Sequence, residues 1–337
     1  MAKHYRNFYE KIISIENLKL AYYKSVRGKR LKNEVLLYTK NLDNNLAKLQ
    51  LALIDGYPPI GHYHYFKIYD PKKREICAAS FSERILHHAI MNICDPAFEK
   101  MQIYDSYACR KNKGTDRAVL RAFHFSKHYK YFLKLDIVKY FNSVSHDILI
   151  QLLEKKFSDK RLNKIFNQII GSYATEPGKG IPIGNLTSQY FANYYLGFLD
   201  HYIKNELRVK GYLRYMDDFV LFSDNIMILH NLAERIKLFC EEVLKLKMHS
   251  PYINSSCMGL PFLGFLIKAQ GIYLSGKKKR RLQKKHKIYE NWYIKGHLSE
   301  AELGVRVNAL WAQTKLARTR NFAKLFDNEV LPRARTV

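Results

Sequence analysis

Three aspartates occupy positions where a carboxylate is unfavourable without a cationic partner. Asp136 interrupts the apolar segment 132–137, and Asp217 and Asp218 lie side by side between the apolar segments 212–215 and 219–222. A buried carboxylate is destabilising unless it is paired, and neighbouring carboxylates raise each other's pKa. A divalent cation relieves both penalties, and an oxygen-only ligand set without His or Cys suits Mg²⁺. We therefore predict that these three catalytic acids bind two Mg²⁺ ions, with Mn²⁺ as an alternative, for a phosphoryl displacement.

Each acid also has an ordinary interpretation. Asp217 and Asp218 could be turn residues, because Asp is common in turns, and Asp136 could be a core acid paired with an arginine. The charge of the chain favours the metal site. Its 337 residues include 57 Lys and Arg against 30 Asp and Glu, a net charge of +27. Such a charge indicates a polyanionic partner, which is nucleic acid or an anionic membrane surface.

The sequence favours nucleic acid over a membrane. It contains no apolar run of about 18 residues and no apolar N-terminal segment typical of a secretory signal. Its five cysteines include no CxxC pair, so they predict neither a disulfide framework nor a zinc site. They fit a reducing cytoplasm.

The elements that must position the three acids follow from the spacing of apolar residues. Helices are predicted over 31–54, 82–101 with Ser82 as N-cap, 115–125, 146–157, from 187 onward, and 226–247. Strands are predicted over 62–69, 131–138, 212–215 and 219–222, with a glycine- and proline-containing loop at 176–184 and a closing hairpin at 260–274. The order of elements over 131–274 is that of a split βαβ core with an antiparallel sheet, so the predicted fold class is α/β (α+β).

The composition changes after residue 275. The segment 277–287 has eight Lys or Arg in eleven positions, and the remainder is helical and basic. A boundary is therefore predicted near 275. The predicted domains are an N-terminal helical extension (1–56), a second lobe (57–130), the sheet-containing core (131–274) and a basic helical region (275–337).

With these elements in place, the chain resembles the reverse transcriptases. The box Tyr215-Met216-Asp217-Asp218 between two apolar strands is similar to the catalytic hairpin of that family. Further segments resemble its other motifs in the same order, namely 71–90, 105–118, 132–141, 178–195 and 260–265. The resemblance covers about 57–270. It implies a right-hand polymerase with fingers over 57–130, a palm over 131–274 and a short thumb over 275–337. The implied activity is RNA-directed DNA synthesis from dNTPs, with template RNA and the RNA/cDNA duplex as partners.

The resemblance also implies roles for individual residues. The carbonyl of Ile137 would complete the metal site. The residues implied to contact the dNTP are Lys73, Arg74, Phe141, Ile183, Gly184 and Gln189. Those implied to contact nucleic acid are Arg84, Arg110, Lys113, Lys277, Lys278, Lys279, Arg280, Arg281, Lys284 and Lys285. The ordinary alternatives are a core ring for Phe141, an ion pair with Glu83 or Asp95 for Arg84, and solvated surface charge for the lysines.

The loop Ile183-Gly184-Asn185-Leu186-Thr187-Ser188-Gln189 narrows the resemblance. Most reverse transcriptases carry Gln and Pro where this chain has Ile183 and Gln189, and the variant resembles reverse transcriptases of diversity-generating retroelements. This resemblance implies copying of template-repeat RNA into cDNA, errors opposite adenine, and mutagenic retrohoming. It also implies an accessory variability determinant protein, a small basic helical oligomer, as partner, in the cytoplasm of a bacterium or from a phage gene.

Three alternatives stay open at this point. One is a retron or group II intron-like reverse transcriptase, against which Ile183 and Gln189 argue. Another is a non-catalytic RNA-binding protein built on a palm, which has no reason to retain three costly acids. The third is a nucleotide cyclase, which needs no basic tail. Primer extension on an RNA template, with and without Mg²⁺, separates them.

Overall fold

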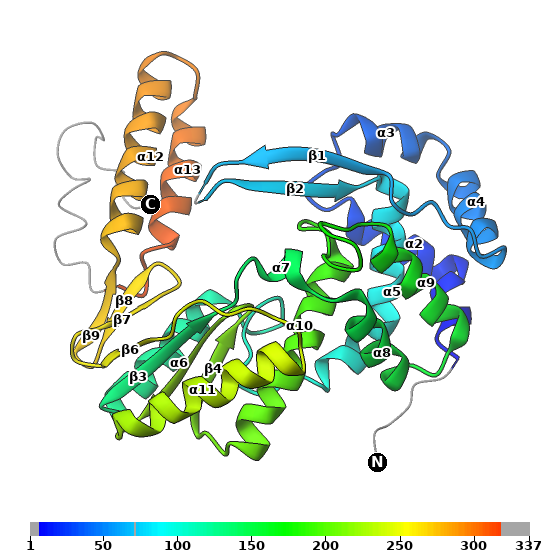
Figure 1. Ribbon diagram of the computed structural model, residues 1–337. Coiled ribbons are helices and arrows are strands. Elements are labelled where there is room, and N and C mark those ends of the chain that lie inside the picture. The colour runs from blue at the N-terminus through cyan, green and yellow to red at the C-terminus, as the bar shows by residue number, and fades with distance from the viewer. Residues whose placement is uncertain (1–6, 71, 318–337) are drawn as a thin grey trace.

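The computed structural model describes residues 7–70 and 72–317 of the chain. Two groups of elements face each other above a central sheet (Figure 1). On one side lie the N-terminal helices and the β1–β2 hairpin, and on the other the α12–α13 hairpin. Within the described ranges, no helix is both long and apolar enough to cross a bilayer.

The N-terminal half is built around one long helix, α5 (Phe81–Glu99). Against it pack α1 (Tyr9–Ile13), α2 (Ile15–Ser25) and α3 (Asn33–Lys40), and α4 (Leu42–Ile54) packs on α1 to α3. The single helix expected over 31–54 is therefore two helices. The break comes at Asn41, whose φ of −128° and ψ of 47° end one helix and begin the next.

The start of α5 also differs from the prediction. The N-cap is Ser80, whose Oγ accepts a hydrogen bond from Glu83 N at 3.3 Å, so Ser82 lies inside the helix. Before it, β1 (Tyr63–Ile68) and β2 (Arg74–Ala79) form an antiparallel hairpin that projects away from the helices (Figure 1). After it, α6 (Thr115–His128) begins with Thr115 as its first residue and Gly114, at φ 99°, as its N-cap.

The central sheet has four strands in the order β4-β5-β3-β6, all antiparallel. They are β3 (Tyr131–Asp136), β4 (Gly211–Tyr215), β5 (Asp218–Ser223) and β6 (Tyr252–Ser255). Between β3 and β4 lie α7 (Tyr140–Ser143), α8 (His146–Lys156), α9 (Lys160–Gly171), α10 (Leu186–His201) and the π-helix Tyr202–Glu206, and α11 (Ile226–Glu242) follows β5. The helix α9 was not predicted from the sequence, in which its segment was interpreted only as basic surface. The helix that begins at 226 was predicted to end at 247, five residues past the end of α11.

Both faces of the sheet are covered, because alternate residues enter two different cores. Leu133, Leu135 and Leu221 belong to the large core with α5, α8, α10 and α11. Phe132 and Val220 belong to a smaller core with α6 and a second sheet. Strand residues alternate between faces, so Asp136 shares the second face with Phe132.

The second sheet corrects the sequence prediction for 260–274. This segment is not the last strand of the central sheet but a separate three-stranded sheet of β7 (Leu260–Phe262), β8 (Phe265–Lys268) and β9 (Gly271–Leu274). The edge position beside β3 is taken by β6, whose sequence YINS has no apolar alternation that would identify a strand. Two helices follow, α12 (Gly276–Ile294) and α13 (Glu300–Ala312), while residues 318–337 of the predicted basic region lie outside the described residues.

Candidate active site

The register of the central sheet brings two of the predicted acids together. Asp136, the last residue of β3, is the direct cross-strand partner of Asp218, the first residue of β5. Both lie on the second face of the sheet by strand alternation. Side chains directly opposite on an antiparallel pair are close neighbours, and like charges there are destabilising. The two carboxylates therefore need a cation between or beside them.

The third acid lies in the turn that joins β4 to β5. Tyr215 pairs with Asp218, which leaves Met216 and Asp217 as a two-residue hairpin loop. Met216 has φ 57°, and Asp217 has no positive φ. Positive φ at the first loop position alone is the pattern of a type II′ turn, in which glycine is usual. A methionine in this conformation needs support from its surroundings.

Burial and mutual repulsion make the two turn acids harder to ionise. Burial raises the pKa of Asp218 to about 7, with Asp136 and Asp217 adding to the rise and Lys134 opposing it. Burial also raises the pKa of Asp217, and so does Asp136, while Arg74 and Lys72 lower it. All three acids therefore lie within electrostatic reach of one another. Raised carboxyl pKa values are the signature of a site that favours an added cation.

The donor set of three carboxylates fits a hard divalent cation. Among residues 7–70 and 72–317, no three His, Cys, Asp or Glu side chains are already grouped to hold a metal ion. Asp218 Oδ1 is nevertheless buried and has no hydrogen-bond partner in the described part of the chain. Its other oxygen, Oδ2, lies 3.2 Å from Lys134 Nζ. The lysine thus supplies part of the positive charge that the acids require. A bound metal ion would either share Asp218 with Lys134 or displace the lysine from it.

Lys134 was not recognised in the sequence as part of the site. It lies two residues before Asp136 on β3 and so points to the same face. Its ammonium also donates to the carbonyl oxygen of Pro261 on β7 at 3.0 Å, which ties the second sheet to the acids. The available signal was a lone lysine inside an apolar strand, two positions from an acid.

Ile137, whose carbonyl is predicted to complete the metal site, follows Asp136 directly at the end of β3. Ile137 forms an isolated bridge with Met248, and the two hydrogen bonds of that bridge join Val138 N to Lys247 O (2.9 Å) and His249 N to Asp136 O (3.0 Å). The bridge therefore does not use the Ile137 carbonyl, which remains available next to the acids.

The loop before α10 connects the predicted dNTP residues. Ile181 N donates to Phe141 O at 2.8 Å, and the carbonyl of Ile183 accepts from Cys77 N on β2 at 2.8 Å. Gly184 has φ +124°, and a Cβ there would lie 2.8 Å from Ile76 Cγ2 and 3.1 Å from Cys77 O. The loop therefore joins the α7 segment to the base of the β1–β2 hairpin, and glycine is required at 184.

Phe141 and Gln189 differ in their surroundings. Phe141 on α7 is half-buried and packs against the large core, with its ring centroid 5.7 Å from that of Tyr140. Gln189 is half-buried on α10. Their contacts with dNTP stay a prediction.

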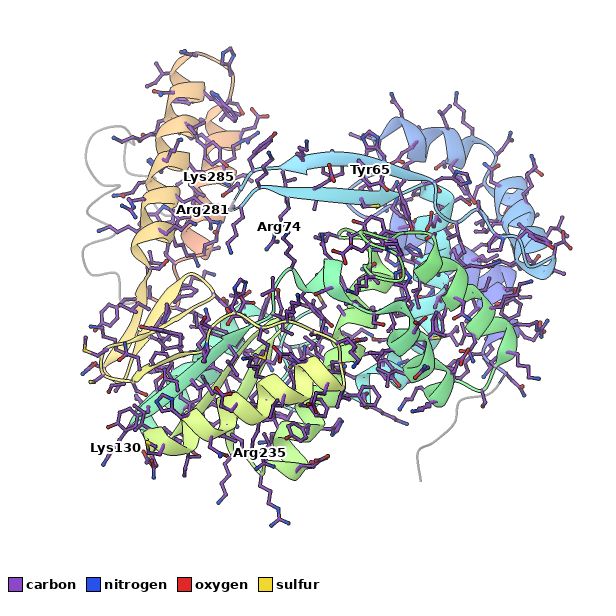
Figure 2. All side chains as sticks on the ribbon, in the orientation of Figure 1. Tyr65, Arg74, Lys130, Arg235, Arg281 and Lys285 are labelled. Carbon is purple, nitrogen blue, oxygen red and sulfur yellow. The ribbon has the colours of Figure 1, made fainter. Side chains whose placement is uncertain are left out.

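A basic cavity of about 890 Å³ lies between the β1–β2 hairpin, the start of α6 and α12. Its lining includes Asp70, Lys72, Arg74, Asp116, Lys277, Lys278, Arg281, Lys284 and Lys285. Seven of these nine side chains are cationic, so the cavity suits phosphate groups. Arg74 extends from the hairpin above the central sheet (Figure 2). Lys73, predicted beside Arg74, is exposed, whereas the unpredicted Lys72 lines the cavity.

The tip of the β1–β2 hairpin contacts α12. Asp70 forms ion pairs with two residues of α12. Its Oδ2 lies 2.5 Å from Lys285 Nζ, and its Oδ1 lies 3.6 Å from Arg281 Nη1. Figure 2 shows Arg281 and Lys285 side by side along α12 at this tip. Lys278, one turn earlier, lies over the Phe265 ring at 3.7 Å. Burial, followed by the charge of Arg281, lowers the pKa of Lys278 to about 8.

Several predicted nucleic-acid residues have structural partners instead. Arg84 pairs with Glu34 of α3 at 2.5 Å, rather than with Glu83 or Asp95. Arg110 donates to Glu99 and to the carbonyls of Ile103 and Ser106, so its guanidinium is occupied. Both guanidinium groups are thus held by partners within the protein, and their contacts with nucleic acid stay a prediction. The sequence did not predict these ion pairs, because Glu34 is distant from Arg84 in sequence and Glu99 lies on another element than Arg110.

Three cationic residues that were predicted to contact nucleic acid do not line the cavity, namely Lys113, Lys279 and Arg280. Lys113 donates to Tyr104 O at 2.6 Å and lies over the Tyr104 ring at 3.7 Å. Lys279 and Arg280 are exposed on α12 but do not line the cavity, since the lining residues of α12 recur at three- and four-residue steps along one helix face.

Comparisons with known proteins agree with this geometry. The family model described as reverse transcriptase (RNA-dependent DNA polymerase) matches residues 69–265. The group II intron-encoded protein LtrA of Lactococcus lactis is 22% identical over 170 residues, covering 48% of this chain and 28% of LtrA. The COX1/OXI3 intron 1 protein of Saccharomyces cerevisiae is 23% identical over 143 residues, covering 40% of this chain and 17% of that protein. The chain thus spans less than a third of the length of these relatives.

A solved structure supports the fold. Apo telomerase from Candida tropicalis aligns with a TM-score of 0.52 at 11% identity, over 85% of this chain and 64% of that one. At that identity the likeness concerns the fold alone. The family match covers more than half of the chain and includes all three acids, and it excludes the nucleotide cyclase alternative. The chain belongs to the reverse transcriptase family, the RNA-dependent DNA polymerases.

Proposed function

We propose that the protein copies an RNA template into cDNA by nucleotidyl transfer at Asp136, Asp217 and Asp218, with two Mg²⁺ ions. The observation that carries the proposal is the direct pairing of Asp136 with Asp218, beside a turn that bears Asp217. We assign fingers, palm and thumb to 57–130, 131–274 and 275–337, after an extension over 1–56. The family match supports polymerisation on RNA, and template RNA, the RNA/cDNA duplex and dNTPs are the proposed partners.

The described residues divide the work of the reaction. When bound, the metal ions would activate the primer 3′-hydroxyl and neutralise the leaving pyrophosphate. Asp136, Asp217, Asp218 and the Ile137 carbonyl would hold them. Arg74 and Lys72, which already act on the charge of Asp217, would bind the triphosphate. Phe141 would lie under the sugar and exclude a 2′-hydroxyl.

The basic face of α12 would grip the template–primer duplex. Lys277, Lys278 and Lys284 line the cavity, and their charges contact phosphates without reading sequence. An RNA/DNA hybrid exposes its phosphates along a shallow groove. Sequence-independent binding suits an enzyme that must translocate.

Primer extension on an RNA template tests the proposal. Asp136→Asn and Asp217→Asn should each abolish dNTP addition in Mg²⁺, while template–primer binding persists. Arg235→Met is the matched surface control, because Arg235 is exposed on α11 at the opposite side of the sheet (Figure 2). An active Asp217→Asn variant would refute the assignment of that acid, whereas a wild-type protein that binds the template–primer duplex but adds no dNTP would favour a non-catalytic RNA-binding role.

At a finer level, we propose that the enzyme belongs to a diversity-generating retroelement. The support is the loop from Ile183 to Gln189, whose apolar first residue cannot donate or accept a hydrogen bond beside the nascent base pair. A lost contact of this kind is worth about 1 kcal/mol, or roughly fivefold in discrimination. This loss lowers fidelity in general and gives no reason for errors opposite adenine alone.

Sequencing of cDNA made from a template-repeat transcript decides between this assignment and an intron-like enzyme. We expect errors concentrated opposite adenine, reduced in Ile183→Gln, and synthesis that depends on a small basic accessory variability determinant protein. Faithful cDNA made without such a partner would favour the retron or group II intron-like alternative, to which the matched relatives point. All five cysteines are free, which agrees with a cytoplasmic setting in a bacterium or phage-infected cell.

A further inference from the structure

Arg214 on β4 is a fully buried arginine three residues before Asp217. Its side chain and that of its ion-pair partner, Asp200 of α10, are both 0% exposed. The guanidinium donates to both Asp200 oxygens, from Nε at 2.8 Å and from Nη2 at 2.6 Å. Tyr212 OH adds a third hydrogen bond to the same carboxylate at 2.6 Å. The charges are thus compensated inside the core, as a buried pair requires.

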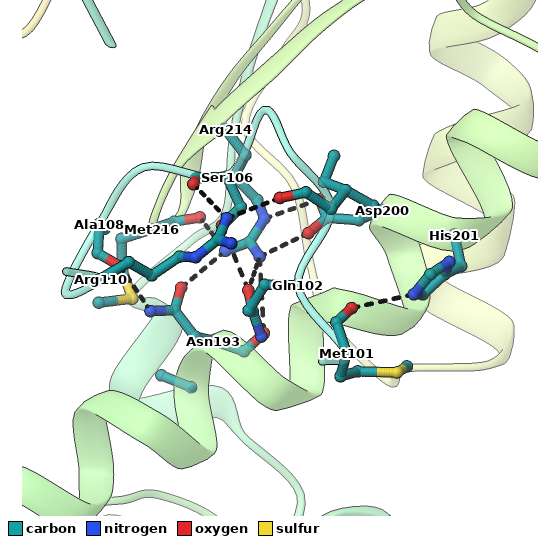
Figure 3. A network of polar contacts seen from close by, with 12 residues as sticks. Met101, Gln102, Ser106, Ala108, Arg110, Asn193, Asp200, His201, Arg214 and Met216 are labelled. Atoms are coloured by element: carbon teal, nitrogen blue, oxygen red, sulfur yellow. Dashed lines mark hydrogen bonds and ion pairs between the residues drawn. The ribbon is translucent and has the colours of Figure 1, made fainter. Parts of the chain in front are cut away.

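The remaining donors of Arg214 reach three other parts of the chain (Figure 3). Nη1 donates to Asn193 Oδ1 on α10 at 3.0 Å and to the carbonyl oxygen of Met216 at 3.1 Å. Nη2 also donates to Gln102 Oε1 at 3.3 Å. All five N–H groups of the side chain are therefore used, which makes its position unusually well determined.

The hydrogen bond to Met216 acts on the catalytic turn itself. The Met216 carbonyl belongs to the peptide group that joins Met216 to Asp217. A peptide group is planar, so holding its oxygen also holds the Asp217 N and Cα, from which the side chain leaves the turn. Met216 also has the unfavourable φ of 57°, a conformation that a non-glycine residue keeps only when its surroundings hold it.

We propose that Arg214 is a positioning residue that aims the Asp217 carboxylate, with Asp200 as the counter-ion that holds the guanidinium in place. The proposal rests on the catalytic role proposed above for Asp217. Arg214 touches neither substrate nor metal, and it acts through the Met216–Asp217 peptide. A purely structural ion pair would instead contribute to folding and leave the rate of a folded enzyme unchanged.

Two variants separate positioning from stabilisation. The first is Arg214→Met/Asp200→Leu/Tyr212→Phe, which replaces the ion pair and the tyrosine bonded to it with apolar side chains of similar size, a change that buried ion pairs often tolerate. The second is Arg214→Lys, which keeps the charge opposite Asp200 but has one nitrogen in place of a fork, too little to span Asp200 and the Met216 carbonyl. Arg121→Met is the control. Arg121 pairs with Asp105 at 2.9 Å in the neighbouring loop and does not contact the turn.

The measurements are single-nucleotide addition on a template–primer duplex, its dependence on dNTP and Mg²⁺, and thermal melting. We expect kcat to fall roughly 30- to 100-fold in both Arg214 variants, because a misplacement on the order of 1 Å has effects of that size. KM for dNTP and the affinity for the duplex should stay within about twofold, while half-saturation by Mg²⁺ shifts upward. Arg121→Met should keep the wild-type kcat.

A wild-type kcat in the folded triple variant would overturn the proposal. If the triple variant does not fold, Arg214→Lys decides: a normal kcat with lowered melting temperature shows a structural pair only. Asp217→Asn run in parallel distinguishes this outcome from failure of the proposed function. An inactive Asp217→Asn beside an active Arg214→Lys rejects only the positioning role, whereas an active Asp217→Asn rejects the catalytic assignment.

Discussion

Replacing Lys134 with methionine tests the electrostatic description of the three acids most directly. Lys134 Nζ lies 3.2 Å from Asp218 Oδ2, and the two side chains are 24% and 23% exposed. At that distance and an effective dielectric constant of about 20, the attraction is about 5 kcal/mol. Partial exposure and the replacement of charge by an apolar side chain reduce the net loss. We expect Lys134→Met to lower the free energy of unfolding by ~3 kcal/mol without divalent ions.

Divalent ions should return part of that stability. With Lys134 gone, Asp136 and Asp218 face each other without a cation, so Mg²⁺ that binds there stabilises the folded state by mass action. The hydrogen bond to Pro261 is still lost, so the recovery is incomplete. In thermal melts, we expect a deficit of about 4 °C in EDTA that shrinks by about half in millimolar Mg²⁺.

Lys130→Met is the control for this experiment. Lys130 is an exposed lysine just before β3, at the far end of the strand from the acids (Figure 2). Its replacement should leave the melting temperature nearly unchanged in either buffer. If Lys134→Met lowered the melting temperature equally in EDTA and in Mg²⁺, that result would refute the argument. It would show that the lysine and the ion do not interact with the same carboxylates.

Three further predictions concern the surroundings of the acids. Burial lowers the pKa of Lys278 from 10.5 to about 8, so its charged form is disfavoured in the folded state. This penalty is fully present below pH 8 and disappears as the pH rises toward 10.5. Duplex affinity at fixed salt should therefore fall between pH 7 and 9, and less so in Lys278→Met; identical pH profiles would contradict it. Gly184→Ala should raise KM for dNTP at least tenfold, since a Cβ would lie 2.8 Å from Ile76 Cγ2 and φ is +124°; a wild-type KM would remove the loop from the dNTP site. Phe141→Ala should admit rNTPs in primer extension, and unchanged sugar discrimination would show that the ring is only part of the core.

The sequence was most informative where residues contradicted their surroundings. Asp136 and the pair Asp217-Asp218 stood out because acids are rare inside apolar strands, and the two strands that carry Asp136 and Asp218 do pair. The strands β3, β4 and β5 and the helices α8, α10 and α11 were also predictable from apolar spacing. The reason is that buried strands and amphipathic helices leave strong periodic signals.

The sequence was least informative where long-range partners decide the outcome. The ion pairs of Arg84 with Glu34 and of Arg110 with Glu99 were not predicted, because the acids lie on other elements. The strand β6 was missed because its polar sequence is held only by pairing with β3. Arg214 carried no signal at all, since its meaning depends on a carboxylate that the fold brings from α10.

The contact of Asp70 with α12 has a consequence for how a long polymer reaches the cavity. Together with the chain between them, the two elements form a closed loop around the basic lining. A free end of a nucleic-acid strand can pass through such a loop, whereas an internal stretch of the strand enters only after the contact between Asp70 and α12 breaks. This contact consists of partly exposed ion pairs, each worth at most about 1 kcal/mol. Ordinary thermal motion and moderate salt are therefore sufficient to break the contact.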